Sequence, residues 1–304
     1  MRYITRETEH PTATDYYCEA TQTTQDHFPR IPAHTHNYYE VYLFLNGFVK
    51  IAIEDRIYKV KYGDILVVPP YTIHQLLPAS DNTDFEYRRI YMYITEPCLS
   101  SFDFKGQSLL PPIQQAAKDK RYFFHIPNED FEQIYQAMYL LFRSKKTDYY
   151  GKEMLNRSRI IQIITFLNKN IQMDTESHDM THITPVIDDV FTYINHHYQE
   201  PLTLDLLANR FFMNKYTLSK LFKEQLMLTV HEYITMKRIS TAKLLIKEGT
   251  PPSRVYLEIG FSNYSTFFRA FKKLENISPE QFLVQMGKEE TPTQNHLIEK
   301  EKYP

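Results

Sequence analysis

Residues 204–223 read LDLLANRFFMNKYTLSKLFK, and residues 255–273 read VYLEIGFSNYSTFFRAFKK. Each stretch begins with a short apolar segment, breaks at a tight turn, and continues into a second segment that starts with Asn and ends in Phe-Lys or Phe-Lys-Lys. This layout is typical of a helix-turn-helix, whose second helix enters the major groove of DNA. The repetition therefore predicts two such units and indicates sequence-specific binding of double-stranded DNA.

A single long helix is predicted between the two units, from about Thr229 to Lys247. Its apolar residues recur at helical spacing, and Gly249 with Pro251 provides a stop signal. About 20 residues span about 30 Å at a rise of about 1.5 Å per residue. One turn of B-DNA is about 34 Å, so two recognition helices held on this rod could enter successive major grooves.

The motifs around these units resemble those of the AraC/XylS-type regulators. The resemblance covers residues 202–282 and rests on Leu218-x-x-Leu221-Phe222-Lys223, Tyr233-Ile234, Arg238-Ile239-x-x-Ala242-x-x-Leu245, Gly260-Phe261-Ser262, Phe267-Phe268-Arg269-x-Phe271-Lys272-Lys273 and Ile277-Ser278-Pro279. It implies an all-helical module of about seven helices that binds promoter DNA, contacts RNA polymerase and acts in a homodimer. Activation and repression both stay open.

Four positions depart from the family pattern. Phe212, Met227 and Asn276 stand where glycine is common, and Tyr256 stands where a small residue is common. If the first three positions keep φ above zero, a residue with a Cβ costs on the order of 1–2 kcal/mol there, and Asn tolerates that geometry best. We therefore expect local strain in both units.

Base-reading candidates are the outward side chains near the start of each recognition helix. They are Lys215, Tyr216, Thr217, Ser219 and Lys220 in the first unit, and Asn263, Tyr264, Ser265 and Arg269 in the second. Arg269 suits bidentate contact with guanine or a phosphate, whereas Asn263 either reads adenine or caps its helix. Three aromatic residues of the same helices are expected in the core: Phe222, Phe267 and Phe271. Phosphate contact, which positions a protein without specifying sequence, is expected of Lys223, Lys272 and Lys273.

The first hundred residues show a different pattern, with short β-branched and aromatic runs separated by turn signals. Strands are predicted at 41–45, 49–53, 56–60 and 65–68. Many closely spaced strands of this kind are typical of a small antiparallel barrel or jelly roll. The predicted fold class is thus α+β in two domains, with an N-terminal cupin-like barrel and a C-terminal all-α domain.

A histidine motif lies within this β region. His34, His36, Glu40 and Gly47 reproduce the first half of the cupin signature, H-x-H-x3-E-x6-G, and residues 63–69 reproduce the second half. The sequence then places His74 five residues beyond Pro69. Three departures from the signature are Arg30 and Tyr71, which replace glycines, and Pro78, which replaces asparagine.

The four residues His34, His36, Glu40 and His74 suggest a site of three nitrogens and one oxygen. Two histidines at i and i+2 face the same side of a strand, and a third from a facing strand completes the set. Such ligands suit Fe(II), Mn, Ni or Zn, so a divalent transition metal is one interpretation. The alternative is that the same residues line a polar ligand pocket or stabilise the barrel by hydrogen bonds.

Cupin enzymes, such as dioxygenases and sugar-phosphate isomerases, are the rival class, with metal-dependent chemistry in the N-terminal domain. AraC-type regulators, however, often carry a cupin-like barrel that senses an effector, so we predict a sensor, no enzyme activity and no catalytic residue. The resemblance implies a small-molecule effector, with carbohydrates as a plausible class. Four tyrosines could stack on a sugar ring, although packing is the commoner role: Tyr38, Tyr42, Tyr58 and Tyr71.

The remaining segments are assigned by periodicity and composition. Apolar residues three and four apart predict two helices within 128–171, which form a hairpin against the barrel and provide a candidate dimerisation face. The polar stretch 172–184 is the expected linker, and Pro185 marks a helix start. The expected domains are therefore the barrel 1–127, the hairpin, the linker, the DNA-binding domain 185–287 and a flexible tail 288–304.

Composition agrees with a folded regulator. The chain of 304 residues has a net charge of −2, yet residues 185–288 carry 13 Lys and Arg against 10 Asp and Glu. Cys18 and Cys98 have no metal-type spacing, which fits a reducing compartment. No signal peptide and no apolar run of about 20 residues is found, so a soluble, cytoplasmic protein without membrane contact is expected.

Overall fold

The computed structural model describes residues 16–24, 31–47, 49–54, 56–78, 86–173 and 185–289. The N-terminal half is built mainly of strands. In chain order these are β1 (Tyr16–Thr24), β2 (Tyr39–Asn46), β3 (Val49–Ile53), β4 (Arg56–Val60), β5 (Asp64–Val68), β6 (His74–Pro78), β7 (Glu86–Ile94) and β8 (Phe123–His125). Its helices are α1 (Glu96–Ser100), α2 (Leu110–Lys118), α3 (Asn128–Ser144) and α4 (Lys152–Met173).

The strands form two antiparallel sheets that pack face to face. One sheet has the order β1-β7-β2-β5-β8 and the other has the order β4-β3-β6. Alternation along β2 explains the packing, because Tyr42 and Phe44 face the second sheet while Val41 and Leu43 face the opposite side. The expected antiparallel, jelly-roll type of fold is therefore present as a two-sheet sandwich.

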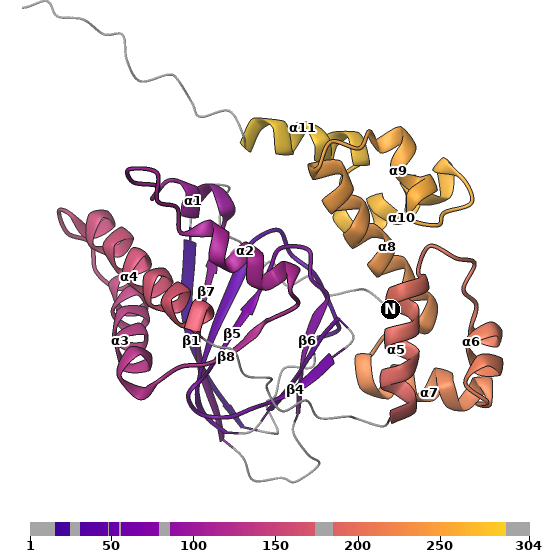
Figure 1. The fold of residues 1–304 in the computed structure, drawn as a ribbon, viewed down its shortest axis with the longest axis horizontal. Coiled ribbons are helices and arrows are strands. Elements are labelled where there is room, and N and C mark those ends of the chain that lie inside the picture. Colours follow the sequence, from indigo (N-terminus) through magenta and orange to yellow (C-terminus); the bar gives the residue numbers. More distant parts are fainter. Residues whose placement is uncertain are drawn as a thin grey trace, which may run out of the picture.

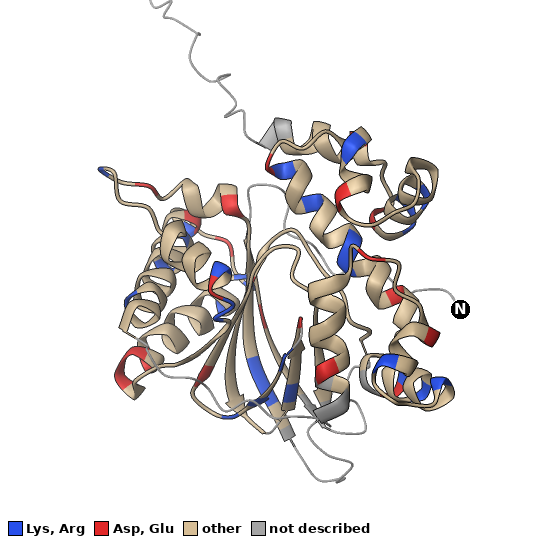
Figure 2. Cartoon of the chain, turned by 45° about the vertical axis from the view of Figure 1, so that its right-hand side comes forward, with Lys and Arg blue, Asp and Glu red and all other residues tan. Residues whose placement is uncertain are grey.

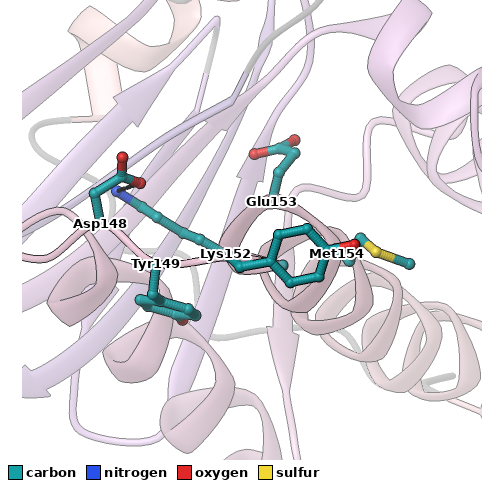
Figure 3. A pocket seen from close by; sticks show the side chains of 7 residues that line it. Asp148, Tyr149, Lys152, Glu153 and Met154 are labelled. Carbon is teal, nitrogen blue, oxygen red and sulfur yellow. Dashed lines mark ion pairs between the residues drawn. The ribbon is translucent and has the colours of Figure 1, made fainter.

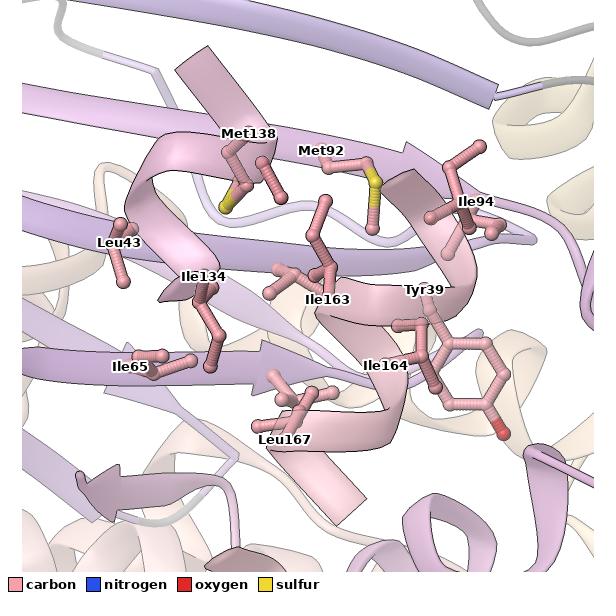
Figure 4. Close-up of a cluster of buried hydrophobic side chains, with 14 of the residues drawn as sticks. Tyr39, Leu43, Ile65, Met92, Ile94, Ile134, Met138, Ile163, Ile164 and Leu167 are labelled. Atoms are coloured by element: carbon pink, nitrogen blue, oxygen red, sulfur yellow. The ribbon is translucent and has the colours of Figure 1, made fainter. Parts of the chain in front are cut away.

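Helices α3 and α4 cover the outer face of the larger sheet (Figure 1). Ile134 and Met138 from α3, with Ile163 and Leu167 from α4, pack against residues of β2, β5 and β7 such as Met92 (Figure 4). Much of the apolar periodicity of this segment is thus satisfied by the sheet. Burial of this face is what fixes the hairpin in place.

The C-terminal half is entirely helical within the described residues. Its helices are α5 (Pro185–His197), α6 (Leu204–Arg210), α7 (Lys215–Leu226), α8 (Val230–Lys247), α9 (Pro252–Glu258), α10 (Tyr264–Glu275) and α11 (Pro279–Glu289). The expected long central helix is α8. It starts at a capping box, in which Thr229 and Glu232 satisfy each other's backbone N–H groups.

The two halves are in contact through the smaller sheet (Figure 1). Ala52, Ile57 and Ile73 belong to the same apolar cluster as the core of α5, α6 and α7. A second apolar cluster, formed by residues of α8, α9, α10 and α11, includes Tyr71 of the N-terminal half. The sensor-like half therefore touches both helical units of the other half.

The strand predictions at 41–45, 49–53, 56–60 and 65–68 match β2 to β5 closely. The expected barrel segment 1–127 also contains α1 and α2, which sequence reasoning did not foresee. Helix α4 extends to Met173, into the expected linker, and α11 extends to Glu289, into the expected tail. The rest of the linker and of the tail, 174–184 and 290–304, lies outside the described residues.

Across the described part of the chain, no helix combines the length and the apolarity that crossing a bilayer requires. Both cysteines, Cys18 and Cys98, are buried.

Candidate functional site

The first helical unit consists of α6, a short turn and α7. Thr203 caps α6 by accepting a hydrogen bond from the backbone N–H of Leu206 at 3.1 Å. Asn214 caps α7 in the same way, accepting from the N–H of Tyr216 at 2.8 Å. In the turn between them, Phe212 has φ +52° and is 98% exposed. The expected left-handed turn is therefore present, with its strain borne by a phenylalanine that has almost no packing.

The second unit repeats this arrangement with α9 and α10. Gly260 has φ +83°, and a Cβ there would lie 2.2 Å from the carbonyl oxygen of Gln199, so only glycine fits this turn. Asn263 caps α10, accepting from the N–H of Thr266 at 2.9 Å. The capping alternative for Asn263 is thus established. Met227 and Asn276 end α7 and α10 at φ +58° and +61°, as the sequence pattern suggested.

One face of each recognition helix is buried, and the other is open. Phe222, Phe267 and Phe271 are fully buried, which confirms that they belong to the core. The exposed basic residues on the same helices are Lys215, Lys220 and Lys223 in α7, and Arg269, Lys272 and Lys273 in α10. Figure 2 marks Lys and Arg positions along the ribbon of the helical half in blue. Positive charge on an outward helix face is what contact with a DNA backbone requires.

Most of the proposed base-reading side chains lie on these open faces. Tyr216, Thr217, Asn263 and Ser265 are exposed, like Lys215, Lys220 and Arg269, whereas Ser219 is half-buried. Tyr264 differs from the rest because its hydroxyl donates to Glu280 and its ring packs on Phe267. Burial, followed by the bond to Glu280, raises the pKa of Tyr264 to about 12. Tyr264 is therefore engaged in holding α10 against α11.

The N-terminal half contains a second concentration of polar groups, between its two sheets. His36, Glu40 and His74 have side chains that are at most 5% exposed. Glu40 Oε2 lies 3.1 Å from His36 Nε2 and also 3.1 Å from His74 Nε2. The three residues come from the loop before β2, from β2 and from β6, and their candidate ligand atoms lie within 4.8 Å of one another.

His34 is placed differently from the expectation. The expected strand through His34 and His36 is wrong, because both residues lie before β2 and His34 makes only an isolated bridge with His74. The His34 ring lies 4.4 Å from the His74 ring, but His34 is not part of the group of three. Burial, followed by the two neighbouring histidines, lowers the pKa of His34 to about 3. His34 is thus a neutral neighbour of the cluster.

Backbone carbonyls fix the orientation of all three imidazoles. Nδ1 of His36 lies 2.8 Å from the carbonyl oxygen of Tyr38, and Nδ1 of His74 lies 3.0 Å from that of Thr72. His34 makes the equivalent contact with the carbonyl of Pro32. A carbonyl only accepts, so each Nδ1 carries the proton, and in the neutral ring Nε2 keeps its lone pair. With both rings neutral, the two Nε2 lone pairs face the Glu40 carboxylate, whereas a protonated ring donates its Nε2–H to that carboxylate.

Aromatic side chains and one arginine surround this cluster. Tyr42 donates a hydrogen bond to Glu40, and the ring of Tyr38 stacks on His36 with centroids 4.0 Å apart. The guanidinium of Arg89 lies 4.6 Å above the Tyr42 ring. Burial alone would raise the pKa of the Glu40 carboxyl, but His36 and His74 donate hydrogen bonds to it when their imidazoles are protonated, and these hold that pKa well below its usual range. Sequence reasoning missed Arg89, although its alternation with Tyr87 and Tyr91 in β7 places all three on the inner face.

A separate hollow of about 520 Å³ lies at the turn between α3 and α4 (Figure 3). It is lined by the consecutive residues 148–154, with an ion pair between Lys152 and Asp148 at 3.8 Å. Because a single local segment forms it, and no side chain from the sheets or from the helical half contributes, it is a surface feature of the hairpin.

Comparison with known proteins gives two matches to family models. Residues 15–134 match the model of the AraC-like ligand binding domain, and residues 207–285 match a helix-turn-helix domain. Together these models span the two-sheet sandwich with the start of α3, and most of the two helical units.

Several curated relatives carry similar names. "Probable transcription factor PqrA" of Proteus vulgaris is 31% identical over 100 residues, which are 32% of this chain and 82% of PqrA. "Uncharacterized HTH-type transcriptional regulator YbfI" of Bacillus subtilis is 25% identical over 78% of this chain and 81% of its own length. "Probable transcriptional regulator LumQ" of Photobacterium leiognathi is 36% identical over 30% of this chain, but the match spans only 37% of LumQ. All three names describe regulators and none describes an enzyme.

Solved structures with similar chains include ToxT from Vibrio cholerae, at 14% identity and a TM-score of 0.35 over 89% of this chain and 98% of ToxT. Another is the C-terminal domain of AraT, a response regulator from Geobacillus stearothermophilus, at 25% identity and a TM-score of 0.35 over 38% of this chain and 98% of that domain.

Proposed function

Because this chain belongs to the AraC family of helix-turn-helix transcriptional regulators, we propose that it reads promoter DNA with α7 and α10 under the control of a small molecule sensed between its N-terminal sheets. The observation that carries this proposal is the pair of capped helices with exposed basic faces, held on one rod, α8. Helix α8 has 18 residues, which correspond to about 27 Å. That length suits two helices placed in successive major grooves, about 34 Å apart.

The positions of the exposed side chains on their helices divide them into candidates for base contacts and candidates for phosphate contacts. Arg269, Lys215, Tyr216, Thr217 and Ser265 lie toward the DNA-facing side of their helices and are our candidates for base contacts. Lys223, Lys272 and Lys273 lie near the helix ends, where they suit phosphate contacts. An arginine suits recognition of guanine, and an asparagine such as Asn263 suits recognition of adenine.

Arg269→Ala tests this assignment directly. Arg269 is exposed and takes part in no core contact, so the variant should fold normally. It should bind a selected DNA site roughly 5- to 150-fold more weakly, equivalent to about 1–3 kcal/mol for a bidentate base contact. Fluorescence anisotropy at physiological salt measures the affinity, and Arg254→Ala on α9 provides an exposed arginine outside the recognition helices as a control. Unchanged affinity of the Arg269 variant would remove that residue from the interface.

The sensed effector would bind near the cluster of His36, Glu40 and His74. Tyr38, Tyr93 and Tyr91 form a chain of ring contacts that starts at His36, with centroids 4.6 Å and 5.1 Å apart. Aromatic faces beside hydrogen-bonding groups suit a sugar ring, so a carbohydrate is our proposed effector class. Isothermal titration with a panel of neutral sugars tests this class, and binding that is lost in Tyr93→Ala would support it.

We also propose that His36, Glu40 and His74 hold a divalent transition metal such as Zn, Fe(II), Mn or Ni. When both imidazoles are neutral, their Nε2 lone pairs repel the Glu40 carboxylate oxygen that they face, and the buried His74 Nε2 has no aligned hydrogen-bond partner. A cation at this point would satisfy all three groups, and the Nδ1–carbonyl contacts are the outer-shell contacts that metal-binding histidines make. The ion would supply an open coordination position toward a ligand.

Metal analysis of tag-free protein tests the metal proposal, with Glu40→Gln and His34→Ala as a matched pair. We expect about one equivalent in the natural sequence and in His34→Ala, and loss of the metal in Glu40→Gln. Absence of metal from all three would contradict the proposal. A metal-dependent cupin enzyme is the alternative function, and it requires turnover of a substrate in addition to the metal.

Two partners complete the proposal. Exposed apolar side chains on α4, namely Met154, Leu155 and Ile161, with Leu140 on α3, leave a face for a second copy of the chain. A homodimer would present four recognition helices, and promoter-bound dimers would contact RNA polymerase. Sedimentation of the natural sequence beside Leu155→Glu tests the dimer, which the charged variant should dissociate.

A further inference from the structure

Tyr71 lies on the turn between β5 and β6 and reaches out of its own domain. It is 3% exposed, and its ring is 6.2 Å from the ring of Phe282 in α11. Its hydroxyl points at the sulfur of Met286, 3.8 Å away, and the ammonium of Lys243 lies 4.9 Å above its ring. A sensor-domain tyrosine is therefore a member of the core of the second helical unit.

The backbone of the same residue is bound to the histidine–glutamate cluster. The N–H of Tyr71 donates to the carbonyl of His36 at 2.7 Å. The carbonyl of the next residue, Thr72, accepts from Nδ1 of His74. On the other side, the carbonyl of Tyr71 accepts a hydrogen bond from Ser240 of α8. One dipeptide thus links two of the three candidate ligands to the helix between the recognition helices.

Strain at Tyr71 indicates that its side chain has an interdomain role. Its φ is +63°, where a residue with a Cβ costs on the order of 1–2 kcal/mol relative to glycine. The cupin-like motif commonly has glycine at this position, and the sandwich alone gains little from a side chain that points away from it. Burial of the aromatic ring against α8, α10 and α11 offsets the strain, and that burial exists only when the two halves are docked.

Other contacts place the same face of α8 on the sensor half. Lys237 pairs with Glu54 at 2.6 Å, and the hydroxyl of Tyr233 donates to the Glu54 carbonyl at 3.1 Å. Lys243 donates to the hydroxyl of Thr35, the residue between His34 and His36, at 3.3 Å. The α8 residues that make these contacts are Tyr233, Lys237, Ser240 and Lys243. They recur every three or four positions, so they share one helix face.

We propose that Tyr71 is an interdomain plug that transmits the geometry of the His36–Glu40–His74 cluster to α8, and so to the relative placement of α7 and α10. A change at the cluster shifts the His36 carbonyl or the Thr72 carbonyl, and the Tyr71 turn moves with them. This inference rests on the proposed function only for its consequence in DNA reading. The coupling itself is a property of the folded chain.

Hydrogen exchange of the full chain without DNA tests the plug. Tyr71→Gly removes the ring while suiting the positive φ, so the sandwich stays folded. We expect amide exchange in α8 to accelerate about 10-fold, because part of the docking free energy is lost. Tyr71→Phe, which keeps the ring, should stay within about twofold of the natural sequence. Unchanged exchange in α8 of Tyr71→Gly would overturn the docking role.

A double-mutant design tests transmission. Glu40→Gln should alter α8 exchange when Tyr71 is present and leave it unaltered in the Tyr71→Gly background. His36→Gln perturbs the cluster from the other side, and it replaces Glu40→Gln if that variant fails to fold. Equal effects in both backgrounds, or no effect in either, would overturn transmission through Tyr71. Failure of DNA binding in the natural sequence would instead contradict the proposed function, since exchange is measured without DNA.

Discussion

Asn263 shows how one side chain is limited to a few roles by its position. Its Oδ1 accepts from both the N–H and the hydroxyl of Thr266, so it satisfies the first turn of α10. Its Nδ2, 3.3 Å from the hydroxyl of Ser262, is on the exposed side and is available for a base. Capping is therefore established by the structure, and base reading is an additional role that DNA binding can reveal.

We predict that Asn263→Ala lowers the free energy of unfolding by about 1 kcal/mol, because a helix cap is lost. Asn263→Asp keeps an oxygen at the cap and should unfold close to the natural sequence in urea. If Asn263 also reads adenine, the Asp variant binds DNA more weakly despite its normal stability. Equal stability of the Ala and Asp variants would show that the cap contributes nothing.

Residue-scale features were predictable where a local backbone rule applies. The positive φ values of Phe212, Met227 and Asn276 follow from the glycine positions that they occupy. The burial of Tyr71 in the other domain was not predictable, because no sequence pattern states which surfaces of two domains meet. His34 was expected beside His36 on one side of a strand. That rule applies only within a strand, and β2 begins after both residues, at Tyr39.

Among the elements, the α3–α4 hairpin is fixed to the sandwich by packing and to itself by a polar contact. Lys169 lies 2.9 Å from Asp130 Oδ2, and Asn170 donates to the same oxygen at 2.9 Å. The hydrogen bond from Lys169, followed by that from Asn170, holds the pKa of Asp130 below its usual value. The charged form of Asp130 therefore stabilises the folded state.

This contact predicts a pH-dependent stability. A carboxyl with a lowered folded-state pKa contributes stability that is present above its unfolded value, about 3.9, and that is lost as the pH falls through the folded pKa. Asp130→Asn should therefore melt below the natural sequence at pH 7, and the difference should shrink as the pH falls below about 4. Thermal melts at several pH values measure this, with Asp148→Asn at an exposed pair as control. A difference that stays constant with pH would exclude the assigned ion pair.

At this scale the strongly periodic elements were the predictable ones. Strands β2 to β5 and helix α8 carry turn or cap signals at both ends, so their limits could be placed from sequence. Strand β7 was not predicted, although its tyrosines and Arg89 alternate with Ile90, Met92 and Ile94 at the period of a strand; the adjacent Arg88 and Arg89 interrupt the apolar run. Short helices such as α1, which begins at the Thr95 cap, leave too little periodicity to detect.

For the whole molecule, the sequence predicted both halves and their order, whereas only the structure shows how they meet. Ion pairs and hydrogen bonds from α8 reach β3–β4 through Glu54 and the cluster loops through Thr35 and Tyr71. A regulator whose two recognition helices share one rod, with that rod bound to the sensor, has a direct physical route from ligand to DNA. A ligand acts through this route only if it binds one arrangement of the halves more tightly than the other.

The most direct test of simultaneous DNA reading by α7 and α10 measures how affinity depends on the spacing between two half-sites. A DNA sequence selected by the full chain should contain two short motifs about one helical turn apart, and inserting 5 base pairs between them rotates one motif to the opposite face. This insertion should reduce affinity to the level of a single half-site, because α8 fixes the separation of α7 and α10. Affinity that is unchanged by the insertion, or failure to select any sequence, would contradict a rigid two-helix reader.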